Sequence, residues 1–428
     1  MALSVLNGVE RGLRLDVALR GAPRGMSRRD RAWVHELVYG VSRLRGRLDH
    51  LIGRRVHGGI GRLDPAVLGL LRLGAYQVLY MDSVPRYAAV SQTVSLARQT
   101  VGRGPGGLVN AVLRGVGEDG DGPERFPRAE DDPLGYLSTW GSHPRWLVAR
   151  WLERWSVEKV SALVEANNRP PALYLVPLDR SPRQAAVDLT AAGVGAEPVG
   201  GGTDCLRLSA GTHPVEALAV LPSIIQDPGA NLVVQFLGAA QGMKVADLCA
   251  APGGKALALS RRVSYILAAD RSEVRMHMLR DNVKRTGGAV GAVVADARRP
   301  PVEAVDMVLL DVPCTGTGTL RRHPDGRWRL SPESVVTLAR VQEDLLEAAA
   351  ELVAPGGLLV YSTCTLEPEE NEEQLESFLG RHPEFTIEPF ADGGAELAAR
   401  IDGRGHLVIL PQDTGFDGAF AGRMRRCA

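Results

Sequence analysis

Val245-Ala-Asp-Leu-Cys-Ala-Ala-Pro-Gly-Gly-Lys255 decides the fold of the C-terminal half of this chain. The stretch begins as a short apolar strand, passes through a turn of small residues and opens a helix. A strand, a glycine turn and a helix in this order are typical of a cofactor-binding βα unit. The adjacent Gly253 and Gly254 allow a ligand to approach the backbone closely, and the helix N-terminus that follows favours a carboxylate.

The residues after Lys244 alternate between strand patterns and helix patterns. The expected strands are Val245–Leu248, Tyr265–Ala269, Val290–Ala295, Met307–Leu310 and Leu358–Tyr361, and the expected helices are Lys255–Arg262, Glu273–Arg285 and Glu333–Val353. This alternation predicts a parallel, doubly wound sheet that is covered on both faces and binds ligands beyond the carboxyl ends of its strands. Three later segments predict an antiparallel addition at one edge: Glu384–Pro389, His406–Leu410 and Phe420–Met424.

The cofactor turn and the strand ends together indicate S-adenosylmethionine. Pro252-Gly-Gly-Lys255 matches neither the G-x-G-x-x-G dinucleotide pattern nor the G-x-x-x-x-G-K-[ST] phosphate loop. Asp270, Asp296 and Asp311 each follow a predicted strand, where carboxylates can accept hydrogen bonds from ribose hydroxyls or an adenine amino group. A single such Asp would more often cap a helix, whereas three at successive strand ends favour a nucleoside cofactor without a pyrophosphate.

Two cysteines follow the fourth and fifth predicted strands. Cys314 lies in Asp311-Val-Pro-Cys-Thr-Gly-Thr-Gly318, and Cys364 lies in Tyr361-Ser-Thr-Cys-Thr-Leu-Glu-Pro-Glu-Glu-Asn-Glu372. A lone cysteine at such a place would more often be a small core residue, but two at one sheet edge favour a reactive role. A thiolate that adds to carbon 6 of cytosine makes carbon 5 able to attack a methyl group. The residues alone leave open which cysteine attacks, and Asp311 is placed to meet the ring near N3 if it is protonated.

These three motifs resemble those of the Sun-type RNA 5-methylcytosine methyltransferases. The resemblance implies that Cys364 is the nucleophile, that Cys314 assists release of the methylated product, and that Asp311 frames the reaction. It also implies that the loop after Cys314 touches RNA through Arg321, Arg322, His323 and Trp328. The cofactor-binding residues that it implies are Cys249, Ala250, Ala251, Pro252, Gly253, Gly254, Lys255, Asp270, Asp296 and Asp311.

Two positions depart from the family pattern. Asn231 stands where the family commonly has Gln, so its role stays open. The tail Asp413-Thr-Gly-Phe-Asp-Gly-Ala-Phe-Ala421 is a loose form of the family's closing motif, and we expect it to be structural only.

The N-terminal residues show helical periodicity. Segments Asp30–Leu48, Leu70–Tyr80 and Asn110–Arg114 resemble the NusB fold, which implies an all-α domain that binds RNA. The expected buried faces are Trp33, Leu37, Val41 and Leu44 in one helix and Leu68, Leu71, Ala75 and Leu79 in another. Residues 1–62 hold 13 Arg against 5 Asp and Glu, and this excess fits a phosphate-binding face as well as a solvated helical surface.

The middle of the chain connects the two ends. Gly117–Pro133 is a linker by composition, and Leu147, Trp151 and Trp155 recur every four residues, which predicts a buried helical face rather than base stacking. Residues 172–210 read as a small α+β unit with strands at Ala172–Pro177 and Cys205–Leu208. We therefore expect domains at 1–130, 131–225 and 226–428.

Composition narrows the class of protein. The 428 residues contain no apolar run of about 18 residues, and the N-terminus lacks the pattern of a signal peptide. The five cysteines lack a zinc spacing, so we expect free thiols in a reducing cytoplasm and no metal. We also expect no membrane partner and a monomer.

The sequence thus predicts a multidomain protein: an all-α NusB-like domain, a small α+β module and an α/β, Rossmann-like, S-adenosylmethionine-dependent methyltransferase domain. The expected activity is methylation of carbon 5 of a cytosine in small-subunit (16S) ribosomal RNA, whether free or in a partly assembled particle. Transfer RNA or another ribosomal cytosine stays open as the substrate. A non-catalytic RNA-binding assembly or antitermination factor is a rival that the intact Lys255, Asp311, Cys314 and Cys364 disfavour.

Overall fold

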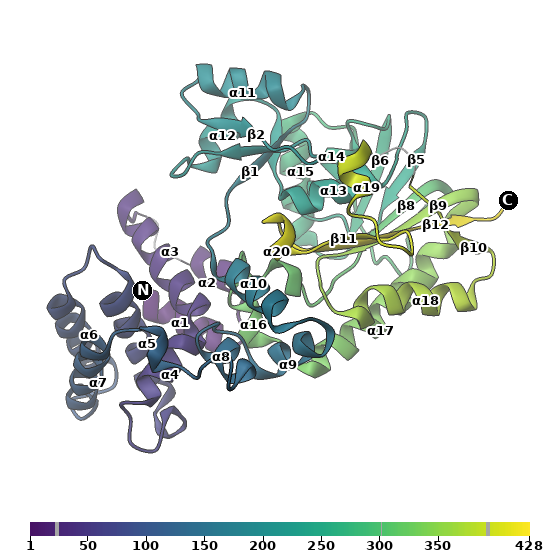
Figure 1. Ribbon diagram of the computed structural model, residues 1–428. Coiled ribbons are helices and arrows are strands. Elements are labelled where there is room, and N and C mark those ends of the chain that lie inside the picture. Colours follow the sequence, from purple (N-terminus) through teal and green to yellow (C-terminus); the bar gives the residue numbers. More distant parts are fainter. Residues whose placement is uncertain (22–24, 301, 391–393) are drawn as a thin grey trace. The chain divides into compact units, whose positions relative to one another are not determined.

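The computed structural model describes residues 1–21, 25–300, 302–390 and 394–428 (Figure 1). The chain forms two compact units: residues 1–170 with 320–331, and residues 171–319 with 332–428. We call the first the helical unit and the second the sheet unit. The division differs from the boundaries expected at 130 and 225, because the helices between residues 131 and 170 pack with the N-terminal ones. Among the described residues, no helix combines the length and apolar character needed to cross a membrane.

In the described part of the helical unit, regular structure is helical throughout. Its elements are α1 (Ala2–Glu10), α2 (Leu15–Arg20), α3 (Arg28–Arg43), α4 (Arg45–Gly53), η1 (Ile60–Arg62), α5 (Pro65–Tyr80), α6 (Arg86–Thr100), α7 (Pro105–Asp119), η2 (Pro123–Arg125), α8 (Pro133–Thr139), α9 (Arg145–Arg154), α10 (Val157–Asn168) and α16 (Gly326–Arg329). Helix α5 contacts α1, α3, α4, α6 and α7, so it forms the centre of the unit.

Burial in α5 extends beyond the apolar stripe that its sequence suggested. Leu71 and Ala75 are fully buried as expected, but Arg72 and Gln77 on other sides of the helix are also buried. Arg72 is tolerated there because its Nε donates to Asp49 Oδ1 at 2.6 Å and its Nη2 to Asp49 Oδ2 at 2.8 Å. Such a bidentate pair offsets much of the cost of removing a guanidinium from water.

The faces predicted for α3 and α9 are largely confirmed. Leu37 in α3 and Leu147 and Trp151 in α9 are fully buried. Trp33 is the exception: it is 38% exposed, so its prediction as a core residue was wrong. Trp155, just beyond α9, is partly buried beneath the cationic groups of Arg154 and Lys159 rather than free to stack on a base.

Residues 320–331 belong to the helical unit although they lie far along the chain. Arg327 in this segment is fully buried, and its Nη1 donates to Ser142 O at 2.9 Å and Asn168 Oδ1 at 2.8 Å. Its Nη2 donates to Asn167 O at 3.1 Å. These acceptors are neutral oxygens, so the guanidinium is held by hydrogen bonds rather than by a carboxylate. The segment is therefore tied to α8–α10 and the turn between them.

The sheet unit begins with a small antiparallel sheet of order β2-β3-β1-β4. Its elements are β1 (Tyr174–Pro177), α11 (Pro182–Ala191), β2 (Ala196–Pro198), β3 (Leu206–Leu208), α12 (Pro214–Val220) and β4 (Ser223–Ile225). The two expected strands are present as β1 and β3, and β2 and β4 are additional. Ser181 caps α11 in a capping box with Gln184, which explains where that helix begins.

The larger sheet has the order β10-β12-β9-β8-β5-β6-β7, with β11 paired to β12. Its strands are β5 (Lys244–Asp247), β6 (Tyr265–Asp270), β7 (Val290–Val294), β8 (Val305–Asp311), β9 (Val353–Thr363), β10 (Phe385–Ile387), β11 (Leu407–Ile409) and β12 (Ala419–Arg426). The helices of this part are α13 (Pro228–Phe236), α14 (Gly254–Leu259), α15 (Glu273–Thr286), η3 (Thr317–Thr319), α17 (Pro332–Glu351), η4 (Pro368–Glu370), α18 (Glu372–Arg381), α19 (Gly394–Ala398) and α20 (Pro411–Thr414).

Strand directions confirm the predicted doubly wound fold. Strands β5 to β9 are parallel, and β10, β11 and β12 form the antiparallel addition. Val245 packs in one apolar core with α14 and α15, whereas its neighbour Ala246 packs in another with α17 and α18. Helices therefore cover both faces of the sheet, as Figure 1 shows. In such a sheet the binding edge is at the carboxyl ends of the strands.

Replacement of Arg327 by Met should destabilise the protein by on the order of 3 kcal/mol, because several buried acceptors would lose their donor. Urea unfolding followed by fluorescence measures this change. Arg128→Met in the same unit is the control, since Arg128 is 75% exposed and its ion pairs lie at the surface. Equal unfolding midpoints for the two variants would contradict a structural role for Arg327.

Candidate active site

The candidate site lies where neighbouring parallel strands end. Strands β5, β8 and β9 are adjacent in the sheet, and the last residue of β8, Asp311, is in register with Ser362 of β9. The turn after β5 leads into α14, and the segments after β8 and β9 carry Cys314 and Cys364. The three motifs singled out in the sequence thus meet at one edge of the sheet.

Lys255 and Asp311 form the central ion pair of this edge. Lys255 Nζ lies 2.7 Å from Asp311 Oδ2, and Ser362 Oγ donates to Asp311 Oδ1 at 2.7 Å. Burial lowers the pKa of Lys255, but the adjacent Asp311 carboxylate outweighs it and the pKa is raised overall. Both Asp311 oxygens thus accept hydrogen bonds from within the protein.

Asp247, the last residue of β5, is buried without a partner. It is 1% exposed, and neither carboxylate oxygen has a hydrogen-bond partner within the described residues. Burial, followed by the nearby Asp311, raises the pKa of Asp247 to about 8. An unpaired buried carboxylate fits a ligand that brings positive charge, and S-adenosylmethionine carries a sulfonium and an ammonium. The chemistry of this edge therefore suits that cofactor.

The backbone of the cofactor turn requires a glycine at position 253. Gly253 has φ +103°, a left-handed conformation that favours glycine, and a Cβ there would lie 3.0 Å from Leu279. Cys249 lies in the same turn, and burial followed by Asp247 raises its pKa far above the ordinary value. Cys249 is thus a packing thiol of the turn, not a reactive thiolate.

Asp270 and Asp296 occupy different environments. Asp270 is 3% exposed, and its Oδ2 accepts from Ala251 N at 3.3 Å, so it ties the end of β6 to the cofactor turn. Asp296 lies beyond β7, with a side chain that is 38% exposed and paired with Arg298 at 2.6 Å. Hydrogen bonds from Arg298 lower the pKa of Asp296 to about 2. Both carboxylates stand beyond strand ends as expected, and Asp296 is the more accessible.

Cys314 and Cys364 are neighbours. Their Sγ atoms lie 3.4 Å apart, and Cys364 N lies 3.4 Å from Cys314 Sγ. The hydrogen bond with Cys364, together with burial, raises the pKa of Cys314 well above its ordinary value. Cys314 therefore keeps its proton strongly. Cys364 also interacts electrostatically with the Lys255 ammonium.

A buried carboxylate that the sequence analysis did not single out connects the two cysteine segments. Glu370 is fully buried, and its Oε1 accepts from Thr315 N at 2.9 Å and from Gln342 Nε2 at 2.9 Å. Thr315 Oγ1 donates to the other carboxylate oxygen and lies 2.7 Å from Thr365 Oγ1. Gln342 Nε2 also donates to Pro313 O at 3.0 Å. Glu370 thereby fixes the residues on either side of Cys314 against the residue after Cys364.

The signal for Glu370 was present in the acidic run after Cys364. Four Glu in six residues look like a solvated helix start, and only the fold shows which of them turns inward. Burial raises the pKa of Glu370, while hydrogen bonds from Thr315 and Gln342 oppose that shift by stabilising the charged form.

The C-terminal tail supports the Cys314 segment through a close backbone approach. Gly418 N donates to Gly318 O at 2.8 Å, and a Cβ on either glycine would lie 2.8 Å from backbone of the other segment. Asp417 N donates to Asp227 Oδ1 at 2.8 Å, which ties the tail to the start of α13. The geometry agrees with the structural role expected for this tail. In the sequence, Gly418 was the residue that could have indicated this role, but only the fold shows that close packing requires a glycine there.

Asn231 is a packing residue of the sheet unit. It is fully buried in α13, its Oδ1 accepts from Asp204 N at 2.8 Å, and its Nδ2 donates to Gln226 Oε1 at 3.3 Å. These bonds link α13 to the small antiparallel sheet. The amide is thus occupied within the protein rather than turned toward a ligand.

The loop after the Cys314 segment lies in the helical unit. Arg321 is 6% exposed, and its carbonyl oxygen accepts from Arg43 Nη2 at 3.1 Å. Trp328 Nε1 donates to Ser42 O at 2.7 Å. Burial lowers the pKa of His323, which disfavours a cationic imidazole there. Arg321 and Trp328 are therefore engaged in packing, which argues against the expected RNA contact for these two side chains.

Three family models match the chain. Residues 234–425 match 16S rRNA methyltransferase RsmB/F, residues 1–118 match the NusB family, and residues 143–216 match the ferredoxin-like domain of RsmF/B-like methyltransferases. Together they cover the helical, small-sheet and large-sheet parts described above, and they confirm the predicted multidomain architecture.

Individual proteins are similar over nearly the full length. A probable ribosomal RNA small subunit methyltransferase B of Synechocystis sp. is 35% identical over 96% of this chain and 94% of its own. The ribosomal RNA small subunit methyltransferase B of Thermus thermophilus is 35% identical over 100% of this chain and 97% of its own. The crystal structure of PH0851 is 25% identical, has a TM-score of 0.79 and covers 99% of this chain and 97% of its own.

Replacement of Glu370 by Gln should loosen the cysteine pair, because an amide nitrogen cannot accept from Thr315. Oxidation with diamide followed by mass spectrometry reports how readily Cys314 and Cys364 couple, and we expect coupling in the variant to slow by about tenfold. Leaving a buried donor unsatisfied should also cost about 1–3 kcal/mol of stability. Glu376→Gln on α18 is the matched control, since its carboxylate is 57% exposed. A coupling rate like that of the unmodified protein would refute the positioning role.

Proposed function

Because this chain belongs to the family of 16S ribosomal RNA methyltransferases of the RsmB/F type, we propose that it methylates carbon 5 of a specific cytosine in 16S ribosomal RNA. The observation that carries the proposal is the pair of sulfur atoms 3.4 Å apart beside the cofactor edge. Methylation of an exocyclic nitrogen or a ribose oxygen does not call for a thiol nucleophile. Carbon 5 of a pyrimidine does, since it becomes nucleophilic only after a group adds to carbon 6.

The family is one of S-adenosylmethionine-dependent methyltransferases, and the residues of this edge fit that cofactor. When bound, the cofactor supplies an electrophilic methyl group on its sulfonium. The residues that would hold it are Asp247, the turn Cys249–Lys255, and Asp270, Asp296 and Asp311. Asp247 would neutralise positive charge, the turn would lie against the cofactor, and Asp270 and Asp296 would accept hydrogen bonds from its nucleoside.

In the proposed reaction, the Cys364 thiolate forms a bond to carbon 6 of the cytosine. The ring electrons move to carbon 5, which then takes up the methyl group. A base, which a water molecule can provide, then accepts the proton from carbon 5; this restores the double bond as the sulfur–carbon bond breaks, and Cys364 leaves as a thiolate. Cys314 would assist this release, and its strongly held proton makes it the weaker candidate for first attack.

Lys255 and Asp311 would prepare this chemistry. The Lys255 ammonium stabilises negative charge at the cysteine edge and holds Asp311 in place. As a carboxylate, Asp311 can accept a hydrogen bond from the 4-amino group of cytosine, which uracil lacks. This would select the base and orient its ring above Cys364.

We assign the parts of the chain accordingly. Residues 226–428 would carry out the methyl transfer, and residues 1–130, with their likeness to the NusB family, would bind ribosomal RNA. Residues 131–225 would connect the two and add RNA-facing surface through the small antiparallel sheet.

Replacement of Cys364 by Ala should abolish methyl transfer, because no other group at the site would activate carbon 5. Transfer of a radioactive methyl group to a 16S ribosomal RNA transcript measures the activity, and we expect a loss of at least a thousandfold. Calorimetric titration with S-adenosylmethionine should give a dissociation constant within about threefold of the unmodified protein. Substantial residual turnover would contradict the nucleophile assignment.

Replacement of Cys314 by Ala should instead allow attack and block release. We expect a covalent protein–RNA complex to accumulate, visible as a slow band on denaturing gels and absent when Cys364 is also replaced. Free RNA alone in the Cys314→Ala lane would overturn the release role.

A further inference from the structure

Ion pairs in the helical unit determine which of its arginines remain available to a partner. Within residues 1–62, many arginines are neutralised by neighbours: Arg45 pairs with Glu10 at 2.9 Å and Arg55 with Asp119 at 2.5 Å. Ion pairs therefore neutralise part of the arginine excess in that stretch. Available charge remains there at exposed residues such as Arg29 and Arg31, and more lies elsewhere in the unit.

A groove between α6 and α7 holds such charge. The groove has a volume of about 750 Å³, and Arg86, Arg98 and Arg114 lie along it. All three arginines are exposed, and among the described residues Arg98 and Arg114 have no carboxylate within ion-pair distance. Arg86 Nη1 donates to Gly117 O at 3.0 Å, and Glu118 is the one carboxylate among the described lining residues.

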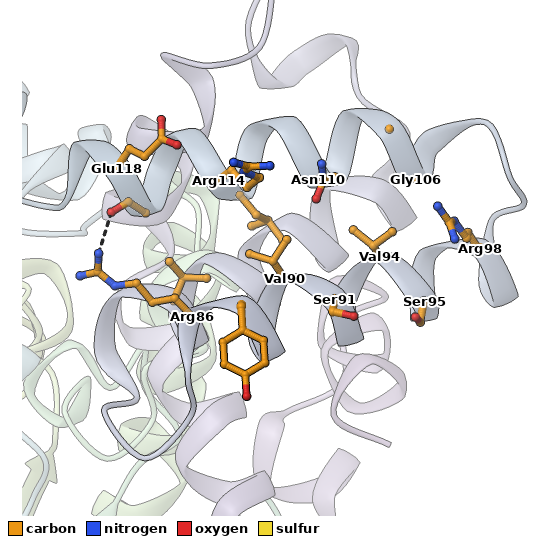
Figure 2. A pocket seen from close by; sticks show the side chains of 15 residues that line it. Arg86, Val90, Ser91, Val94, Ser95, Arg98, Gly106, Asn110, Arg114 and Glu118 are labelled. Carbon is orange, nitrogen blue, oxygen red and sulfur yellow. Dashed lines mark hydrogen bonds between the residues drawn. The ribbon is translucent and has the colours of Figure 1, made fainter.

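Small residues create the groove, and polar and aromatic groups line it. Gly106 and Gly107 of α7 face α6 at one end, where a Cβ on Gly106 would lie 3.3 Å from Arg98. Val90 and Val94 contribute an apolar surface, as Figure 2 shows, with Asn110 and Arg114 on the facing helix. Tyr87 lines the groove with its side chain 79% exposed. An exposed tyrosine beside exposed guanidinium groups offers a stacking surface next to positive charge.

We propose that this groove binds a single-stranded segment of the RNA substrate. The arginines would contact phosphates, the Tyr87 ring would stack on a base, and Ser91, Ser95 and Asn110 would offer hydrogen bonds to sugar or base. Arg86 and Arg98 are twelve residues apart on one helix, which corresponds to about 18 Å, enough for a short run of nucleotides. This inference rests on the proposed function, since it assigns part of the RNA substrate to the helical unit.

The groove fits single-stranded RNA better than the other partners of similar size. An amphipathic helix could contact the apolar residues of the groove, but its apolar face would also meet three arginines without a charge to pair with them. A duplex would meet the arginines with its phosphates but would leave the Tyr87 ring without an unstacked base. An acidic peptide would pair with the arginines but would leave the Tyr87 ring without a stacked base, and competition between the two ligands distinguishes them.

Binding of a fluorescein-labelled twelve-nucleotide oligouridylate to the full chain tests the proposal. Fluorescence anisotropy at several KCl concentrations gives the affinity and its salt dependence. Each phosphate contact in a single strand contributes about −0.7 to the slope of log K against log salt, so Arg98→Ala/Arg114→Ala should reduce the slope by about 1.4. Tyr87→Ala should weaken binding by about tenfold through lost stacking while leaving the slope unchanged.

Arg29→Ala/Arg31→Ala is the matched control, since both side chains are exposed on α3. Equal losses in the two double variants would overturn the groove and indicate general charge attraction. Competition by a polyglutamate peptide as effective as RNA would also overturn it. Unchanged unfolding midpoints and S-adenosylmethionine affinity establish that the variants are folded. Because binding is measured without methyl transfer, failure of the groove and failure of the proposed methylation are seen separately.

Discussion

Two parallel strands that end side by side determine what this protein can do. Strands β8 and β9 are neighbours in register, so the segments that follow them begin at the same height, and this brings Cys314 Sγ to 3.4 Å from Cys364 Sγ. Backbone hydrogen bonds from Val312 N to Ser362 O and from Gly318 N to Cys364 O join the two segments, and side chains add to them. Glu370 accepts hydrogen bonds from the residue after Cys314, and the Lys255–Asp311 pair fixes the strand end above it. The chemistry of the edge depends on this buried polar network.

Much of this arrangement could be predicted from sequence. The βα turn, the strand alternation and the paired cysteines have local signatures, and the structure confirms the sheet, its antiparallel addition and the meeting of the three motifs. Buried polar partners could not be predicted. Glu370 lies in an acidic run that reads as solvent-facing, and Arg327 looks like an ordinary surface cation in the sequence. Which member of such a run turns inward depends on contacts far along the chain.

Tertiary packing adds two features that the local pattern did not indicate. Helix α5 is buried on nearly all sides because five other helices surround it, so its polar residues Arg72 and Gln77 are internal. The arginine-rich N-terminal stretch suggested a phosphate-binding face, but internal ion pairs neutralise part of its charge. The groove between α6 and α7 carries fewer arginines, yet Arg98 and Arg114 there remain available to a partner. Counting charges along a sequence is therefore a weaker guide than the pairing of those charges in the fold.

The central claim is that a sulfur atom of this chain bonds to carbon 6 of a cytosine during methylation. An RNA substrate in which 5-fluorocytidine replaces cytidine tests it most directly. Carbon 5 then carries fluorine in place of the proton that must be lost, so the covalent adduct cannot break down. After incubation with S-adenosylmethionine, digestion and mass spectrometry should find one methylated fluorocytidine nucleotide attached to the peptide that contains Cys364. Attachment at Cys314, or full methyl transfer without any protein-bound nucleotide, would contradict the account.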